Sequence, residues 1–181
     1  EPGYFVEFGG SYKDMKEAFL SLGFALILAI VLVYIVLASQ FESLKQPFII
    51  MFTLPLGVIG VMLVLALTGT TLSVASFVGG IILAGIVVNN GIVLIDHMNQ
   101  LRTKGMKKTE AIIKAGSDRM RPVLITAITT MMGMLPMALS RQEGSELKSP
   151  MALTVIGGLL SATFFTLVVI PIIYSLVVKD K

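Results

Sequence analysis

The sequence has 181 residues, of which 55% are hydrophobic and only 14% charged, and its formal net charge is +3. Soluble domains carry about 25% charged residues, and a soluble chain of this size could not bury so much apolar surface. These values exclude an ordinary soluble enzyme, a disordered chain and a typical nucleic-acid-binding protein, and they leave an integral membrane protein. Cysteine is absent, which excludes disulfides, a thiol nucleophile and cysteine-based metal sites.

The first predicted element is a short extended segment at residues 4–8, where apolar and polar side chains alternate as in a strand. A single strand is not stable without a sheet. We therefore expect residues 1–17 to form the end of a domain outside the membrane and its connector. Because the chain opens with Glu1 and with half a sheet, we expect it to belong to a longer protein. A stand-alone small membrane protein with a structural or regulatory role is the alternative.

Five apolar stretches are each long enough for a membrane-spanning helix, which needs roughly 20 residues. One uncharged run, residues 46–95, is too long for a single helix, and the sequence TGTTLS at 68–73 predicts a turn that divides it. The predicted fold class is an all-α integral membrane protein, a bundle of five transmembrane helices. Its spans are expected at residues 18–39, 47–67, 74–97, 122–140 and 149–178, followed by a cytoplasmic tail at 179–181.

Prolines predict where these helices begin and bend. A proline is tolerated in the first turn of a helix, whereas inside a helix it removes a hydrogen bond and kinks the chain. Helix starts are expected at Pro47, Pro122 and Pro150, and kinks at Pro55, Pro136 and Pro171.

The distribution of cations predicts the orientation of the spans. Ten Lys and Arg residues fall on one side of the predicted membrane and four on the other, and the connection at 96–121 alone carries seven. Because such connections stay in the cytoplasm, we expect the N-terminus outside and the C-terminus inside. We favour this interpretation over binding of nucleic acid or of a specific lipid. Within the connection, residues 109–115 predict a short amphipathic helix on the cytoplasmic surface, capped by Thr109 and ended by Gly116.

Polar residues inside a span are candidates for function, because placing them in lipid is costly. Asn89 and Asn90 lie near the middle of the third span, and Asp96 lies at its end. Helical spacing places Gly85, Asn89 and Asp96 on one face. Asn89 could belong to a polar network inside the bundle, or it could form an interhelical hydrogen bond that only holds helices together.

The fourth span offers three further candidates. Thr126 and Thr130 lie one helical turn apart in the segment RMRPVLITAITT, although threonine in a membrane helix often bonds its own backbone. Arg119 precedes the apolar stretch, and its side chain could extend to the interface or down into a polar core.

Small residues four positions apart predict close approaches between helices. These spacings describe packing rather than function. They occur at Ala75/Gly79, Gly80/Ala84, Gly157/Ser161 and Gly158/Ala162.

The sequence contains no arrangement typical of catalysis. It has no Ser/His/Asp order, no pair of acids inside a span and no phosphate-binding glycine loop, so we do not expect an enzyme. His97 has no metal-binding partner nearby in the sequence. The methionines at 131, 132, 134 and 137 are interpreted as adaptable core filling rather than a path for soft metal ions. We therefore expect no metal site and no cofactor.

Two long motifs resemble one family. They are GIVVNNGIVLIDHMNQLRTKGMKKTEAIIKAGSDRMRPVLITAITTMMGMLPMAL at 85–139 and YIVLASQFESLKQPFIIMFTLPLGVIGV at 34–61. Both closely resemble the second half of RND (resistance–nodulation–division) efflux pumps, with the hydrophobe/amphiphile, AcrB-like branch nearest. The resemblance covers essentially the whole chain, so the five spans look like the last five of the family's twelve. The leading strand looks like the end of the periplasmic porter-type domain before them.

The resemblance implies a proton-motive-force-driven multidrug exporter in a bacterial inner membrane, with the proton as coupling ion. It implies a homotrimer that passes amphiphilic small molecules to an outer-membrane channel through a periplasmic adaptor. The lipid bilayer is a further expected partner, and nucleic acid is not expected as one. A pair of Asp residues in the N-terminal half of such pumps binds the protons. An RND-type transporter of lipid or metal cargo is the alternative, because cargo is chosen by domains outside this sequence.

The resemblance also assigns roles residue by residue. Thr126 and Arg119 match the Thr and Arg of the family's proton relay, and Asn90 matches a neighbouring Asn of the pattern. Asn89 occupies the position of the family's Lys. Its neutral amide cannot form an ion pair but can hydrogen-bond a protonated carboxyl group, which leaves proton and sodium coupling both open. Thr130 and Asp96 are possible secondary members of the relay.

Overall fold

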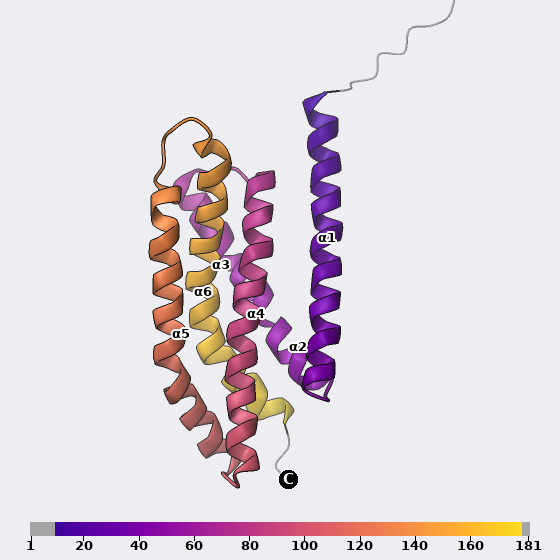
Figure 1. Cartoon of the computed structure of the whole chain (residues 1–181), viewed down its shortest axis with the longest axis vertical. Helices are drawn as coiled ribbons and strands as arrows, with labels where there is room; N and C mark the ends of the chain where they lie inside the picture. Colours follow the sequence, from indigo (N-terminus) through magenta and orange to yellow (C-terminus); the bar gives the residue numbers. More distant parts are fainter. Residues whose placement is uncertain (1–9, 179–181) are drawn as a thin grey trace, which may run out of the picture.

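The computed structural model describes residues 10–178 and consists of six α-helices. Together they form an elongated bundle, and no strand occurs in the described part (Figure 1). The helices are α1 (Ser11–Gln40), α2 (Lys45–Met51), α3 (Thr53–Thr68), α4 (Val74–Thr103), α5 (Lys108–Ala138) and α6 (Ser145–Val177). With α2 and α3 forming one span, five helices are long and apolar enough to cross a membrane. This confirms the predicted all-α membrane bundle, while the strand expected at 4–8 and the tail at 179–181 lie outside the described residues.

The helices extend beyond the predicted spans. Helix α1 begins at Ser11, so residues 11–17, expected to belong to the connector, continue the first span as helix. Helix α4 ends at Thr103 instead of near position 97. The expected boundaries mark where apolar residues stop, whereas strong helix formers such as Lys16, Glu17 and Gln100 continue the backbone pattern into polar surroundings.

The short amphipathic helix expected at 109–115 is not a separate element. These residues are helical, but α5 begins at Lys108 and runs without interruption through Gly116 and Pro122. Gly116 does not adopt the left-handed backbone that would end a helix. Pro122 removes a single backbone hydrogen bond, which is too little to interrupt a helix packed along its length. In the same way α6 starts at Ser145, so Pro150 lies inside it.

The expected interruption near Pro55 divides the second span at Phe52. This break places Pro55 in the first turn of α3, where a backbone N–H would have no partner in the helix. At the break, the buried Thr53 hydroxyl donates a hydrogen bond of 2.6 Å to the carbonyl oxygen of Ile50. The side chain therefore supplies a donor where the helix ladder is interrupted.

Thr53→Val is expected to lower the free energy of unfolding by about 1 kcal/mol, because the carbonyl of Ile50 loses this donor in an apolar environment. Thermal unfolding of the protein in detergent measures the change. Thr68→Val is the matched control, since the exposed Thr68 hydroxyl donates to the carbonyl of Val64 at 2.8 Å. Equal shifts for the two variants would show that the break does not depend on the Thr53 bond.

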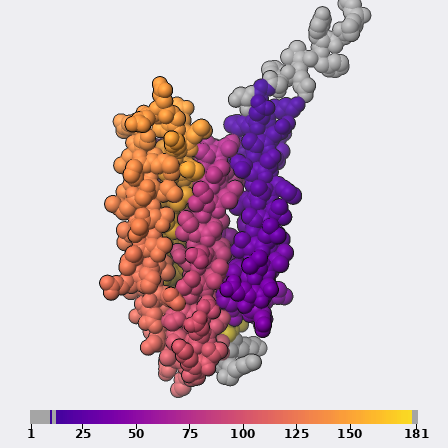
Figure 2. Space-filling model, in the orientation of Figure 1, coloured from indigo at the N-terminus to yellow at the C-terminus, as the bar shows by residue number. Residues whose placement is uncertain are grey.

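Helix α6 is the centre of the bundle and packs against α2, α3, α4 and α5. Among the described helices, α1 contacts only α2 and α4, and it stands beside α4 at the edge of the molecule (Figure 2). The turn after α1, the α4–α5 connection and the C-terminal end of α6 lie at one end of the molecule (Figure 1). We call this the basic end, because it holds the seven cations of residues 96–121.

Close helix approach is confirmed at several of the predicted glycines. A Cβ atom on Gly157 would lie 2.6 Å from the Cβ of Val64, and one on Gly79 would lie 2.7 Å from the carbonyl oxygen of Met151. Gly60, which the spacing did not single out, faces Ser161 and Gly157 even more closely. Gly80, in contrast, has open space at that position. Gly158 faces Leu83 of α4 closely as well, so glycines permit close approach of α6 to both α3 and α4.

Candidate functional site

Helix α4 holds two adjacent asparagines in different environments. Its start is fixed by Ser73 and Ser76, whose side chains and backbone amides cap one another at 3.3 and 3.4 Å. From there the helix turns Asn90 toward the core, where it is 9% exposed, and leaves Asn89 exposed. The side chain of Asn89 has no hydrogen-bond partner among residues 10–178, so it belongs to no polar network within that range.

Asn89 lies in the wall of a cavity of about 440 Å³ between α1 and α4. The remaining wall is mostly aliphatic, and Gln40 at the end of α1 is the other amide that lines it. Gly85 shares this wall, and both Gly85 and Asp96 are exposed, in agreement with the face expected for Asn89. Asp96 accepts a hydrogen bond of 2.7 Å from Gln100 one turn later on the same helix.

Helix α5 presents three threonines whose hydroxyl groups bond the helix backbone. Thr126 donates to the carbonyl of Pro122 at 2.9 Å, Thr130 to the carbonyl of Thr126 at 2.9 Å, and Thr129 to that of Ile125 at 2.8 Å. This is the backbone bonding that the sequence left as one alternative. Thr126 and Thr129 are nevertheless exposed, so each hydroxyl oxygen retains lone pairs for a donor outside the helix.

Arg119 lies two turns before Thr126 on α5 and is half-buried. Its Nε atom is buried and has no hydrogen-bond partner in the described part of the chain. A buried donor of a charged group without a partner is costly, so we expect its partner in another part of the protein.

The structure places these candidates on two neighbouring helices but does not join them. Helices α4 and α5 pack against one another, and among residues 10–178 no hydrogen bond or ion pair links Asn89, Arg119 and Thr126. Within the same range each presents polar atoms without an interhelical partner.

Sequence reasoning missed a second polar group, at the basic end. The Tyr174 hydroxyl donates to the side-chain oxygen of Asn99 at 2.7 Å, and the Asn99 amide donates to Gln46 at 2.8 Å. Beside it, His97 and Asp118 lie 3.2 Å apart, joining α4 to α5. A buried tyrosine requires a partner for its hydroxyl, but no sequence spacing could identify that partner 75 residues away.

Residues 1–178 match the sequence pattern of the AcrB/AcrD/AcrF family. The chain belongs to this family. The AcrB/AcrD/AcrF match confirms the resemblance to RND transporters that the two motifs carry. It also agrees with the five membrane-length helices of this chain.

Several relatives in this family are similar to the chain. It is 42% identical over 177 residues to the swarming motility protein SwrC of Bacillus subtilis, matching 97% of this chain and 17% of SwrC. It is 34% identical over 174 residues to the cobalt-zinc-cadmium resistance protein CzcA of Cupriavidus metallidurans, matching 96% of this chain and 16% of CzcA. It is 38% identical over 168 residues to the multidrug resistance protein MdtC of Proteus mirabilis, matching 92% of this chain and 16% of MdtC.

A solved structure shares the fold. The crystal structure of a heavy metal efflux pump matches 98% of this chain with a TM-score of 0.85 and 34% identity, and the match covers 18% of that chain. The present chain therefore spans less than a fifth of the length of the relatives it matches.

Proposed function

We propose that this chain is a membrane-embedded segment of a proton-driven RND efflux transporter in a bacterial inner membrane. Asn89, Asn90, Arg119 and Thr126 would contribute one side of the proton relay, with Thr130 and Asp96 as secondary members. The observation that carries this proposal is the buried, unpartnered Nε of Arg119 on α5. Acids from the other half of the transporter would supply the missing partner.

The same proposal includes the acids that face these residues and the assembly in which the transporter works. An Asp pair in the N-terminal half would face Asn89, Arg119 and Thr126, and protonation of that pair would change its hydrogen bonds to them. Asn89 donates and accepts as a neutral amide, so it would sense protonation without an ion pair. The transporter would work as a homotrimer with a periplasmic adaptor and an outer-membrane channel, with its N-terminal end periplasmic and its C-terminal end cytoplasmic.

Two classes of cargo fit the family. We propose amphiphilic small molecules first, on the strength of the two AcrB-like motifs and the similarity to MdtC. Divalent metal ions are the second candidate, supported by the similarity to CzcA and to a heavy metal efflux pump. Export assays with a dye and with Zn²⁺ or Co²⁺ in the full-length transporter distinguish the two.

Thr126→Val in the full-length transporter is expected to lower proton-coupled export about tenfold without lowering the amount of protein in the membrane. The change keeps the shape of the side chain but removes a hydroxyl, and one hydrogen bond to a charged group contributes about 1.5 kcal/mol or more. Export from proteoliposomes with an imposed pH gradient measures the effect.

Thr129→Val is the control for this experiment. Thr129 is also exposed, and its hydroxyl makes the same kind of backbone bond, at 2.8 Å, so loss of that bond alone affects both variants. Export that falls equally in both, or in neither, would contradict the role of Thr126 in the relay.

A further inference from the structure

Three polar side chains at the basic end form one continuous chain of hydrogen bonds. Tyr174 on α6 donates its hydroxyl proton to Oδ1 of Asn99 at 2.7 Å, and Nδ2 of Asn99 donates to Oε1 of Gln46 on α2 at 2.8 Å. The three residues come from three different helices and lie 53 and 75 residues apart in sequence. Asn99 is the central link, because its amide uses one acceptor and one donor to join α4 to both neighbours.

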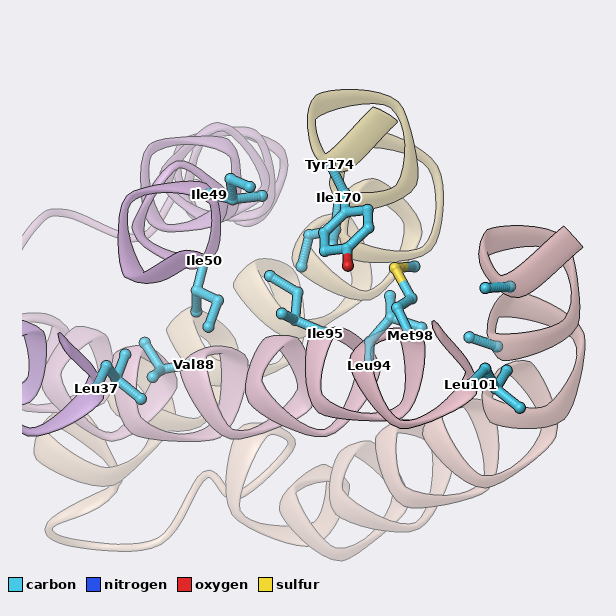
Figure 3. Close-up of a cluster of buried hydrophobic side chains, with 12 residues drawn as sticks. Leu37, Ile49, Ile50, Val88, Leu94, Ile95, Met98, Leu101, Ile170 and Tyr174 are labelled. Carbon is cyan, nitrogen blue, oxygen red and sulfur yellow. The ribbon is translucent and has the colours of Figure 1, made fainter. Parts of the chain in front are cut away.

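The surroundings make these bonds difficult to replace. Tyr174 is fully buried, and it lies among Ile95, Met98 and Ile170, none of which is exposed (Figure 3). Gln46 and Asn99 are partly exposed and Tyr174 is fully buried, so the tyrosine hydroxyl depends on Asn99 for its partner. The apolar contacts around it are not directional, so they permit small rotations and slides. The hydrogen-bond chain therefore fixes the rotation and register of α4 against α2 and α6.

The same three helices meet again closer to Asn89. A Cβ atom on Gly91 would lie 3.0 Å from Ile50 of α2 and 3.3 Å from Ile170 of α6. Between Gly91 and Asn99 the helix is uninterrupted, and prolines fall inside α5 and α6 but not inside α4. Asn99 is ten residues from Asn89, about 15 Å along the helix axis. A rotation of α4 at Asn99 is therefore passed on to Asn89.

We infer that Asn99 is a positioning residue for ion coupling: through its bonds to Gln46 and Tyr174 it holds α4 in the rotation that directs Asn89 outward and Asn90 into the core. This inference rests on the proposed role of the two asparagines in the relay. Gln46, Asn99 and Tyr174 are not members of the relay. Their inferred role is to set the rotation of α4 and so the direction of Asn89.

The test uses the full-length transporter in proteoliposomes with Asn99→Leu, which removes both bonds, and Tyr174→Phe, which removes one and keeps the ring. Thr103→Val is the matched control, because Thr103 lies on α4 but its hydroxyl bonds only the carbonyl of Gln100, at 2.8 Å. The double variant Gln46→Asn with Asn99→Gln exchanges the two amides. Spin labels on cysteines introduced at Leu44 and Lys104 report the distance between the α1–α2 turn and the end of α4.

Asn99→Leu is expected to lower the maximal export rate about five- to tenfold, the size expected for two interhelical hydrogen bonds. The KM for cargo should stay within about twofold, because the inferred role of Asn99 is to orient α4 and not to bind cargo. The distribution of label distances should broaden in the same variant. Tyr174→Phe should show a smaller change of the same kind, the exchanged pair should recover most of the rate, and Thr103→Val should behave as wild type.

An unchanged label distribution in Asn99→Leu and Tyr174→Phe would overturn the inference, and so would a broadened distribution with an unchanged maximal rate. A rate loss that Thr103→Val shares would overturn it as well. The Thr126→Val experiment keeps the two proposals apart. If Thr126→Val lowers export and Asn99→Leu does not, only the positioning role fails, whereas an inert Thr126→Val removes the relay on which that role depends.

Discussion

Gly157→Ala is expected to destabilise the full-length transporter by about 2–3 kcal/mol, because it forces α3 and α6 apart. The added Cβ would lie 2.6 Å from the Cβ of Val64 and 2.8 Å from the carbonyl oxygen of Gly60. One of these atoms is backbone and the other is the branch point of a stiff side chain, so neither can move aside cheaply. Thermal unfolding in detergent should show a midpoint several degrees lower.

Gly80→Ala provides the matched control. It makes the same chemical change in a membrane-spanning helix, and a Cβ atom there meets nothing within 4 Å. Both variants gain about 1 kcal/mol of helix propensity, so their difference isolates the close packing. We expect Gly80→Ala to be as stable as wild type or more so. Equal midpoints for the two variants would contradict the tight seam between α3 and α6.

Asn89→Leu is expected to abolish most proton-coupled export while leaving the protein stable. The side chain of Asn89 has no hydrogen-bond partner among residues 10–178 and lines a mostly aliphatic cavity, so leucine fits without leaving a polar group unpaired. Export should nevertheless fall about tenfold or more, because the amide would be lost as the proposed hydrogen-bond partner of the coupling acids. Initial export rates under an imposed pH gradient and the unfolding temperature are measured on the same preparation.

Asn89→Gln tests whether the position of the amide matters as well as its presence. It keeps both hydrogen-bonding groups on a side chain one methylene longer, so we expect partial export. Asn89→Lys, which restores the residue of the family's pattern, should retain export if acids from the other half face this position. Full export in Asn89→Leu would show that this side chain takes no part in coupling.

The helical boundaries show how far sequence patterns reach. Uncharged runs located all five spans, and Pro55 indicated the interruption between α2 and α3. The patterns failed where a helix continues beyond the apolar run, at residues 11–17 and 98–103, and where α5 passes through Gly116 and Pro122. Local signals for a helix end are weak, roughly a lost bond or about 1 kcal/mol. Packing of α5 against α4 and α6 outweighs them at Gly116 and Pro122, whereas helix propensity extends α1 through the exposed residues 13–17.

The candidate residues show a similar division. Asn89, Asn90, Arg119 and Thr126 were identified from their polarity within or beside apolar runs, because such groups are rare where lipid replaces water. Which of the two adjacent asparagines on α4 is buried could not be predicted from the sequence, because burial depends on which neighbouring helix each side chain faces. The bonds among Gln46, Asn99 and Tyr174 were also invisible, because nothing along the chain relates three residues on separate helices.

The sequence by itself determined that this protein is a bundle of five membrane-spanning helices and which residues are costly to place in it. Both follow from the free energy of transferring each side chain from water to lipid, which depends on the residue type and not on its position in the fold. The tertiary structure alone decided which helix is central, which neighbouring helix each glycine faces, and which polar atoms find partners. These depend on directional contacts between distant segments, and such contacts exist only after the helices have packed.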